Sequence, residues 1–255
     1  GPSPDKDPMA ATPVEIPGGV VEALRNARSV TVLTGSGISA ESGVPTFRDA
    51  QSGLWARYDP MQLATPEAFV RDPQLVWRWY SWRRELIGAA APNTGHRALV
   101  ELERRVPSFT LVTQNVDGLH QEAGSGLALE LHGNIRRTKC SREDKTIESP
   151  GEEEPPRCPD CGAYLRPDVV WFGEALPEGV MEGASRAARE CDLFLSIGTS
   201  SLVYPAASLP YEALENGAQV VEVNPEATPL TPHAAYSIRG SAGEVLPALV
   251  AAAYR

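Results

Sequence analysis

Short apolar runs that alternate with helical patterns most strongly constrain the fold of this chain. Four runs rich in β-branched and aromatic residues each end at a glycine or a polar turn, and they span residues 29–34, 109–113, 193–197 and 220–224. Helical patterns lie beside them at residues 20–27, 97–105, 210–216 and 243–254. Strands that alternate with helices are typical of an α/β fold built on a parallel sheet.

The ends of these four strands predict where a ligand binds. In doubly wound sheets, ligands bind in the crevice outside the carboxyl ends of the strands. We therefore expect the turns after Thr34, Thr113, Ile197 and Val223 to face one crevice.

Two segments interrupt the alternation. Residues 49–95 carry aromatic side chains at helical spacing, which predicts a helical insert. Residues 137–166 are polar and acidic and hold three of the four cysteines, which predicts a small zinc-type insert. The chain thus reads as a Rossmann-like domain with two inserts.

The predicted boundaries follow from these segments. Gly1-Pro2 looks like the remnant of a protease cleavage, so residues 1–8 are expected to be disordered and outside the fold. The Rossmann-like domain is expected to comprise residues 9–48, 96–136 and 167–255.

Composition narrows the classes of partner. The 255 residues carry 33 acidic and 23 basic side chains, and a net charge of -10 disfavours sequence-blind binding to nucleic acid. No apolar run approaches the roughly 18 residues that span a bilayer, and no signal-peptide core is visible. We expect a cytoplasmic monomer with no membrane or nucleic-acid partner.

A glycine-rich turn follows the first predicted strand. Gly35-Ser36-Gly37-Ile38-Ser39-Ala40 fits the dinucleotide fingerprint, whose glycines let the backbone approach a pyrophosphate at a helix N-terminus. A tight turn without a ligand is the alternative. The acidic residue that follows this fingerprint in ordinary dehydrogenases has no counterpart here in a strand-end context.

Six motifs in a fixed order sharpen this interpretation. They are GSGISAESGVPTFR at 35–48, TQNVDGLH at 113–120, LHG at 131–133, VVWFGE at 169–174, GTS at 198–200 and VNPE at 223–226. As a set they resemble the sirtuin family of NAD-dependent protein deacylases, over residues about 20–250. The sequence departs at Ser36, where most members carry alanine, but the flanking glycines are kept.

The resemblance implies that NAD is the co-substrate and which residues hold each part of it. The phosphate loop and GTS would cradle the pyrophosphate, VNPE the adenosine ribose, and TQNVD the nicotinamide ribose and carboxamide. The expected NAD contacts are Gly35, Ser36, Gly37, Ile38, Ala40, Glu41, Thr46, Phe47, Arg48, Trp55, Gln114, Asn115, Val116, Asp117, His132, Gly198, Thr199, Ser200, Asn224, Pro225, Glu226 and Ala242.

The resemblance also implies a catalytic set of His132, Asn115 and Arg48. In the family's mechanism, the acyl oxygen of the modified lysine attacks the ribose and expels nicotinamide. His132 then deprotonates a ribose hydroxyl, and the products are free lysine and O-acyl-ADP-ribose. A histidine suits the role of base because its ordinary pKa of about 6.5 lies near working pH. Phe47 would exclude water from the reacting carbon.

The helical insert carries a pair that points to the acyl group. Tyr80 and Arg83 share one helix face, and a phenol beside a guanidinium suits a carboxylate. With Ala64, the pair resembles the class III sirtuins, which remove succinyl, malonyl and glutaryl groups and, to a lesser extent, acetyl. Ordinary helix packing is the alternative. The peptide is expected to add a strand along Val169, Val170, Trp171 and Phe172.

The cysteines depart from the family pattern of two C-x-x-C pairs. Cys158 and Cys161 supply one pair, Cys140 supplies one more thiolate, and Glu143 stands at the fourth position. Three thiolates and a carboxylate can form a structural zinc site. Asp144 as the fourth ligand, or no metal at all, are the alternatives.

Three other functions stay open at this point. The first is a protein deacylase that acts mainly on acetyl groups. The second is a mono-ADP-ribosyltransferase that uses the same cleavage of NAD. The third is a noncatalytic NAD-sensing module, which would be expected to lack the base that His132 provides.

Overall fold

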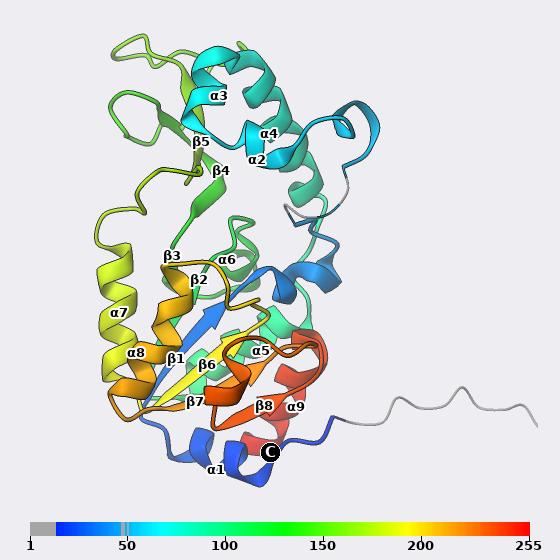
Figure 1. Ribbon diagram of the computed structural model, residues 1–255, viewed down its shortest axis with the longest axis vertical. Coiled ribbons are helices and arrows are strands. Elements are labelled where there is room, and N and C mark those ends of the chain that lie inside the picture. Colours follow the sequence, from blue (N-terminus) through cyan, green and yellow to red (C-terminus); the bar gives the residue numbers. More distant parts are fainter. Residues whose placement is uncertain (1–13, 47–48, 50) are drawn as a thin grey trace, which may run out of the picture.

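A six-stranded parallel sheet forms the larger part of the protein (Figure 1). The computed structural model describes residues 14–46, 49 and 51–255, so the predictions for residues 1–8, Phe47 and Arg48 lie outside the described residues. The strand order is β3-β2-β1-β6-β7-β8. The strands are β1 (Ser29–Thr34), β2 (Ser108–Thr113), β3 (Ala128–Glu130), β6 (Leu193–Ile197), β7 (Gln219–Val223) and β8 (Tyr236–Ile238).

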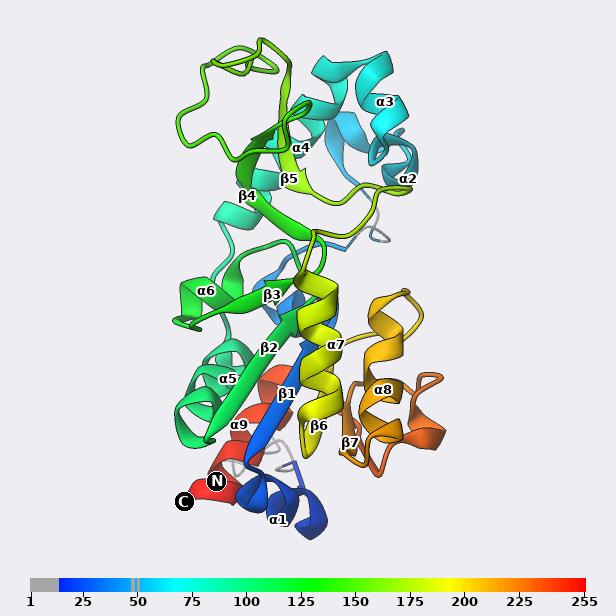
Figure 2. The ribbon, with the colours of Figure 1, turned by 90° about the vertical axis from the view of Figure 1, so that its left-hand side faces the viewer.

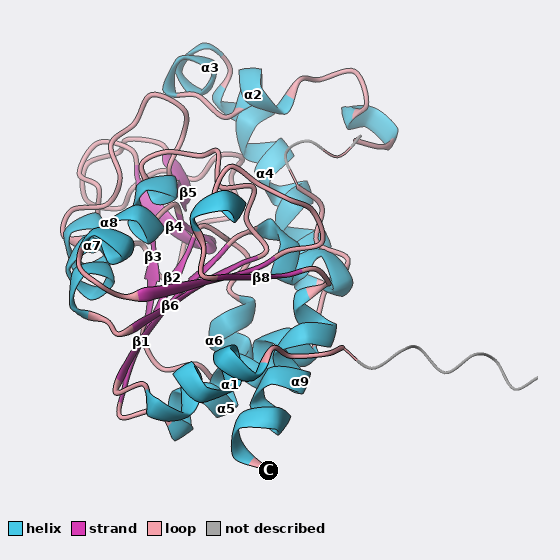
Figure 3. Cartoon of the chain, turned by 60° about the horizontal axis from the view of Figure 1, so that its bottom comes forward, coloured by secondary structure: helices cyan, strands magenta, loops and turns pink. Residues whose placement is uncertain are grey.

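Helices cover both faces of this sheet, which is why the central strands are apolar on both sides. Figure 3 shows α7 (Val180–Glu190) and α8 (Leu209–Glu215) on one side of the sheet. On the other side lie α1 (Gly18–Asn26), α5 (Thr94–Arg105) and α9 (Ala242–Tyr254). Each side has its own buried apolar cluster. None of the described helices combines the length and apolarity needed to cross a membrane.

The carboxyl ends of four neighbouring strands meet at one edge of the sheet. Thr34 pairs with Thr113 on one side and with Ile197 on the other, and Ile197 pairs with Val223. All of these pairings are parallel, so the prediction that the four turns share one edge is confirmed. The helix expected after the glycine-rich turn begins as a 3₁₀ segment, η1 (Ser36–Ser42).

A second, smaller unit lies beyond this edge (Figures 1 and 2). It combines η2 (Gly53–Trp55), α2 (Pro60–Leu63), α3 (Pro66–Arg71) and α4 (Pro73–Gly88) with the antiparallel pair β4 (Gly133–Cys140) and β5 (Leu165–Val169). Asp59, Thr65 and Asp72 cap the three α-helices, each followed by proline, so the chain breaks into short helices here. Buried aromatic side chains from α4 and from the segment after β5 join the two inserts.

Four strands were not predicted from the sequence. They are β3, β8, β4 and β5, and the first two have only three residues each. Such short strands carry no apolar run of their own and are defined by pairing with a neighbour. The strand β7 also ends at Val223 and leaves Asn224 outside the sheet. The connections η3 (Ala206–Ser208), η4 (Thr231–His233) and α6 (Leu119–Ala123) complete the described elements.

Candidate active site

The glycine-rich loop after β1 packs backbone to backbone on the loop after β6. The N–H of Gly35 donates to the Ile197 carbonyl at 3.0 Å, and the N–H of Gly37 donates to the Gly198 carbonyl at 2.8 Å. A Cβ on Gly37 would lie 2.7 Å from the Cα of Gly198, and a Cβ on Gly35 would lie 2.7 Å from the carbonyl oxygen of Gly198. Glycine is therefore required at both positions because the two loops touch.

This packing leaves N–H groups that suit an anion. Within the described part of the chain, the backbone N–H groups of Ser36, Thr199 and Ser200 have no hydrogen-bond partner. Unpaired N–H groups at the start of a helix and in a tight loop form a ready site for phosphate. The residues present thus fit the pyrophosphate of NAD, although Gly35 and Gly37 themselves donate to β6 rather than outward.

The residues after β2 connect the three central strand ends. The side-chain amide of Asn115 donates to the Gly35 carbonyl at 2.9 Å, and the backbone N–H of Asn115 donates to the Thr113 hydroxyl at 3.0 Å. The side chain of Gln114 donates to the Thr199 hydroxyl at 3.1 Å. Both side chains are half-buried. They therefore lie at the junction of the loops that follow β1, β2 and β6.

Asp117 lies deeper than the sequence analysis expected. Its carboxylate is buried, accepts the Ser39 hydroxyl at 2.6 Å, and accepts the Leu119 N–H at 2.9 Å. Ser39 also lies 3.4 Å from His96 Nε2. Asp117 thus supports the loop from below, and each of its oxygens keeps a further lone pair for the predicted contact with the nicotinamide half of NAD. The sequence analysis gave no role to Ser39, although it lies inside the glycine-rich motif.

His132 follows β3 and has a defined ring orientation. Its Nδ1 lies 3.0 Å from the Gln114 carbonyl, so Nδ1 carries the proton and donates. The other nitrogen, Nε2, is then the basic atom. Burial lowers the pKa of His132 below its ordinary value, and the hydrogen bond to Gln114 opposes this shift in part. The ring is neutral at working pH and able to accept a proton.

His120 is buried beneath this edge and supports it. Its Nε2 lies 2.8 Å from the Thr34 hydroxyl, which in turn donates to Thr113 at 2.8 Å. Burial, with a smaller contribution from His96, lowers the pKa of His120 to about 3. It stays neutral and does not serve as a base at this pH.

The acyl-pocket candidates converge from both inserts. Tyr80 is buried on α4, and its hydroxyl accepts a hydrogen bond from Trp171 Nε1 at 2.9 Å. Arg83 is also buried on α4, with its guanidinium over the Trp79 ring. Ala64 is buried nearby in the same apolar cluster as Tyr80 and Trp171.

The segment after β5 connects this cluster with His132. The N–H of Val170 donates to the His132 carbonyl at 2.9 Å, and the N–H of Phe172 donates to the Ala64 carbonyl at 3.0 Å. The N–H of Trp171 donates to Glu174 at 2.8 Å, and Val169 pairs with β4. Three N–H groups that the sequence analysis assigned to an added strand are therefore engaged within the chain. An added peptide would have to use other groups here.

Several predicted NAD contacts have side chains that are used elsewhere. Ile38 is buried in the core under the sheet, and Glu41 accepts the Gly243 N–H at 3.2 Å at the start of α9. Trp55 packs on Trp82 in the helical insert. Val116 packs against the apolar cluster of the insert, and the backbone N–H of Thr46 donates to the Asp49 carboxylate. Ala242 is buried at the start of α9. Three other predicted contacts are exposed: Ala40, Pro225 and Glu226.

Comparison with known proteins decides the family. A model of the Sir2 family matches residues 35–205 of this chain. The chain belongs to the Sir2 family. A relative from Aquifex aeolicus named "NAD-dependent protein deacylase" is 55% identical over 206 residues, which cover 80% of this chain and 86% of the relative. A relative of the same name from Thermus thermophilus is 56% identical over 226 residues, which cover 87% and 89%.

Solved Sir2 structures superimpose over nearly the whole chain. One is a Sir2 homolog in complex with NAD, with a TM-score of 0.87 and 44% identity over 95% of each chain. Another is a Sir2 homologue mutant in complex with 2′-O-acetyl ADP ribose, with a TM-score of 0.86, 45% identity, and coverage of 93% of this chain and 96% of the other.

Three cysteines of this Sir2-family chain lie together in the second insert. The sulfur atoms of Cys140, Cys158 and Cys161 all lie within 4.8 Å of one another. The backbone N–H of Glu143 donates to Cys140 Sγ at 3.3 Å, an arrangement that stabilises a thiolate. A second cluster, of Glu143, Cys158 and Asp160, shares Cys158. The donor set fits a tetrahedral structural zinc.

Proposed function

We propose that this enzyme removes succinyl, malonyl and glutaryl groups from protein lysines, and acetyl groups less efficiently. Sir2-family membership and the relatives described above make the chain an NAD-dependent protein deacylase, with NAD as co-substrate. The acyl preference is the proposal. The observation that carries it is that Tyr80 and Arg83 are buried together on α4, where Trp171 donates a hydrogen bond to the Tyr80 hydroxyl.

The hydrogen bond to Tyr80 supports a donor role for its hydroxyl. Trp171 donates to the Tyr80 oxygen, so the proton of that hydroxyl is directed to a different acceptor. Burial raises the pKa of Tyr80 above its ordinary value, which keeps the proton in place. The pocket therefore offers one neutral donor.

Arg83 supports the charge of the proposed substrate. Burial lowers the pKa of Arg83, and the nearby Tyr80 and Asp49 oppose this. The guanidinium of Arg83 is buried and carries a positive charge, so an incoming acyl carboxylate would meet a complementary charge at low solvent exposure. The flat fork of arginine matches a carboxylate in two parallel hydrogen bonds. An acetyl group ends in a methyl group, which offers Arg83 neither a negative charge nor a hydrogen-bond acceptor.

We further propose the roles of the remaining residues. NAD, when bound, supplies an ADP-ribosyl group with nicotinamide as its leaving group. The N–H groups of Ser36, Thr199 and Ser200 would hold the pyrophosphate, and Asn115 would orient the nicotinamide ribose. His132 would accept a proton at Nε2. Phe47 and Arg48 keep the roles that the family resemblance implies.

The experiment that tests the proposed specificity uses one peptide with four modifications. The peptide carries acetyl-, malonyl-, succinyl- or glutaryl-lysine at the same position, and NAD-dependent removal is followed by mass and by nicotinamide release. We expect kcat/KM for the acidic groups to exceed that for acetyl by about tenfold or more, since charged pairs in a buried site discriminate strongly. Equal or higher efficiency with acetyl would show that the enzyme is mainly a deacetylase.

The pH dependence of the reaction should follow His132. The base must be neutral, and burial lowers its pKa below the ordinary value of 6.5, so the neutral form persists to lower pH. We therefore expect the pH at which kcat/KM falls to half of its plateau on the acid side to lie below 6.5. A profile measured with a succinyl-lysine peptide checks this, and a half-point above 6.5 would contradict it.

We also propose that Cys140, Cys158, Cys161 and Glu143 hold a structural zinc. Cys158→Ser is expected to remove the metal and lower the melting temperature, because Cys158 belongs to both clusters. Metal content is measured by mass spectrometry. Cys191→Ser is the matched control, since Cys191 lies at the end of α7 and outside the clusters. Full zinc in Cys158→Ser would refute the site.

A comparison of two further variants tests which carboxylate is the fourth zinc ligand. Glu143→Gln is expected to make the zinc easier to remove with a chelator, whereas Asp160→Asn should not, although both carboxylates contact Lys145. The reverse order would assign Asp160 as the ligand.

A further inference from the structure

An ion pair between a buried carboxylate and a partly exposed arginine lies beneath the loop that follows β7. Glu222 is near the end of β7, and its side chain is only 1% exposed. Its carboxylate accepts the hydroxyls of Thr228, of Thr231 at 2.5 Å and of Ser237 at 3.2 Å. Both terminal nitrogens of Arg239 lie 3.2 Å from the same carboxylate. The charge is thus fully surrounded by donors from the loop and from β8.

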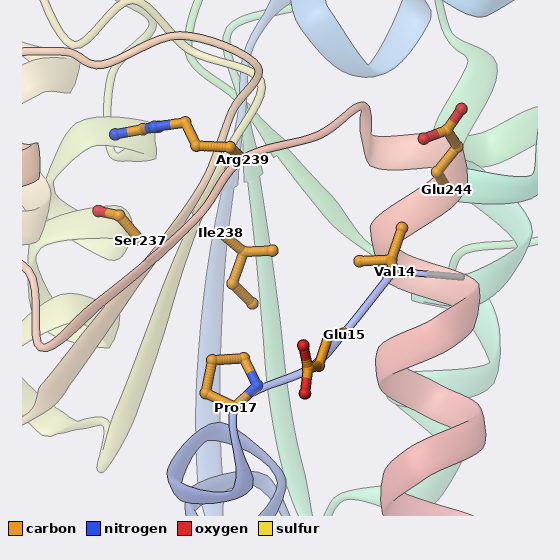
Figure 4. A pocket seen from close by; sticks show the side chains of 7 residues that line it. All are labelled: Val14, Glu15, Pro17, Ser237, Ile238, Arg239 and Glu244. Carbon is orange, nitrogen blue, oxygen red and sulfur yellow. The ribbon is translucent and has the colours of Figure 1, made fainter. Parts of the chain in front are cut away.

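Arg239 also holds the loop backbone. Its Nη1 donates to the Asn224 carbonyl at 3.1 Å and to the Glu226 carbonyl at 2.9 Å. The Asn224 side chain donates to the same Glu226 carbonyl at 2.8 Å. In Figure 4, the side chains of Arg239 and Ser237 extend to the same side, away from Glu15. One guanidinium therefore joins a buried carboxylate to two carbonyls of the loop.

Stability alone is a poor explanation for this arrangement. The neighbours of Glu222 on β7, Val221 and Val223, are apolar and buried, and an apolar residue would pack at this depth without desolvating a charge. A buried carboxylate paired with a partly exposed arginine adds little net stability over apolar packing, because the carboxylate loses its hydration, but its hydrogen bonds have strict geometric requirements. The pair is therefore best understood as fixing the shape of residues 224–231.

The loop of residues 224–231 lies directly beside the loop after β6, which holds candidates for binding the pyrophosphate. The Gly198 N–H donates to the Val223 carbonyl at 2.9 Å, and Asn224 is the next residue in the chain. We propose that Glu222 and Arg239 are positioning residues that hold this loop in the shape needed by the adenosine half of NAD, and so set the KM for NAD. This inference rests on the proposed assignment of Asn224 to the adenosine ribose.

The test replaces Arg239 and separates the two substrates. In Arg239→Met we expect KM for NAD to rise about tenfold, with kcat and KM for the acyl peptide unchanged within about twofold. The dissociation constant of ADP-ribose, measured by calorimetry without peptide, should rise by the same factor as KM for NAD. A purely structural role would lower the melting temperature without this selective change.

Arg25 provides a matched control. Its guanidinium also donates to two backbone carbonyls, those of Ala252 and Ala253 at the end of α9, which lie outside the loop of residues 224–231. Arg25→Met is expected to lower the melting temperature and leave KM for NAD unchanged. If Arg239→Met behaves like Arg25→Met, the positioning role is wrong.

A second variant covers the case in which Arg239→Met does not fold. Glu222→Gln keeps the shape and one accepting oxygen, but its amide nitrogen donates instead of accepting, and it removes the charge that fixes Arg239. It is expected to raise KM for NAD less than Arg239→Met does, and an unchanged KM would overturn the inference.

Asn224→Ala separates the inference from the assignment on which it rests. If this variant leaves both KM for NAD and the ADP-ribose affinity unchanged, the assignment of Asn224 fails. If it raises KM for NAD while Arg239→Met and Glu222→Gln do not, the assignment stands and the positioning role fails.

Discussion

Replacing His132 by asparagine is expected to lower kcat for deacylation by about 10³-fold, a typical loss when a general base is removed. The reason is the ring orientation: Nδ1 donates to the Gln114 carbonyl, so Nε2 is the only nitrogen able to take a proton. The rate is measured as release of deacylated peptide at saturating NAD. The melting temperature of the variant shows whether the fold is intact.

The matched control is His233→Asn. His233 is exposed in η4 and packs only against the Tyr211 ring, so its replacement is expected to leave kcat unchanged. A folded His132→Asn enzyme with more than a tenth of the normal kcat would rule out the role of base. Nicotinamide release by the normal enzyme without any acylated peptide would instead favour an ADP-ribosyltransferase, and no release with any acylated peptide would favour a noncatalytic NAD sensor.

Arg83→Met is expected to lower kcat/KM for a succinyl-lysine peptide by about 10²-fold, as expected when one partner of a buried charged pair is lost. The value for an acetyl-lysine peptide should change by less than about threefold, because acetyl has no carboxylate for the guanidinium to bind. The ratio of the two values is the measured quantity, and it cancels any general loss of folded enzyme.

Arg84 is the control for this ratio. It is the next residue on α4, and its guanidinium donates to the Ile135 and Arg137 carbonyls and lies over the Trp77 ring. Arg84→Met is expected to reduce stability and to leave the ratio unchanged. Tyr80→Phe should lower the ratio by less than Arg83→Met, because it removes one neutral donor. An unchanged ratio in Arg83→Met would reduce the pair to helix packing.

Sequence patterns predicted the four central strands of the sheet, β2, β1, β6 and β7, and the edge at which they end. The runs at 29–34 and 193–197 became β1 and β6 with the same bounds, because apolar β-branched residues in parallel strands are buried on both faces. The helix spacing of Tyr80 and Arg83 also placed both side chains on one buried face of α4. These predictions depend only on the spacing of apolar residues over a few residues of a strand or a few turns of a helix.

The features that the sequence did not predict concern pairings between distant segments. The strands β3 and β8 form only through their neighbours, and the N–H groups after β5 were already engaged by Ala64, His132 and Glu174. The hydrogen bond from Trp171 to Tyr80 joins residues 91 positions apart. No local pattern contains such information.

The sequence by itself determined the α/β class, the edge where the strands end, and the identity of the residues available there. The tertiary structure decided which atoms of those residues point outward. It turned Asp117 toward Ser39, gave His132 its basic Nε2, and buried Glu222 against Arg239. The physical reason is range: periodic burial is set by neighbours along the chain, whereas hydrogen-bond partners are chosen only when elements far apart in sequence pack together.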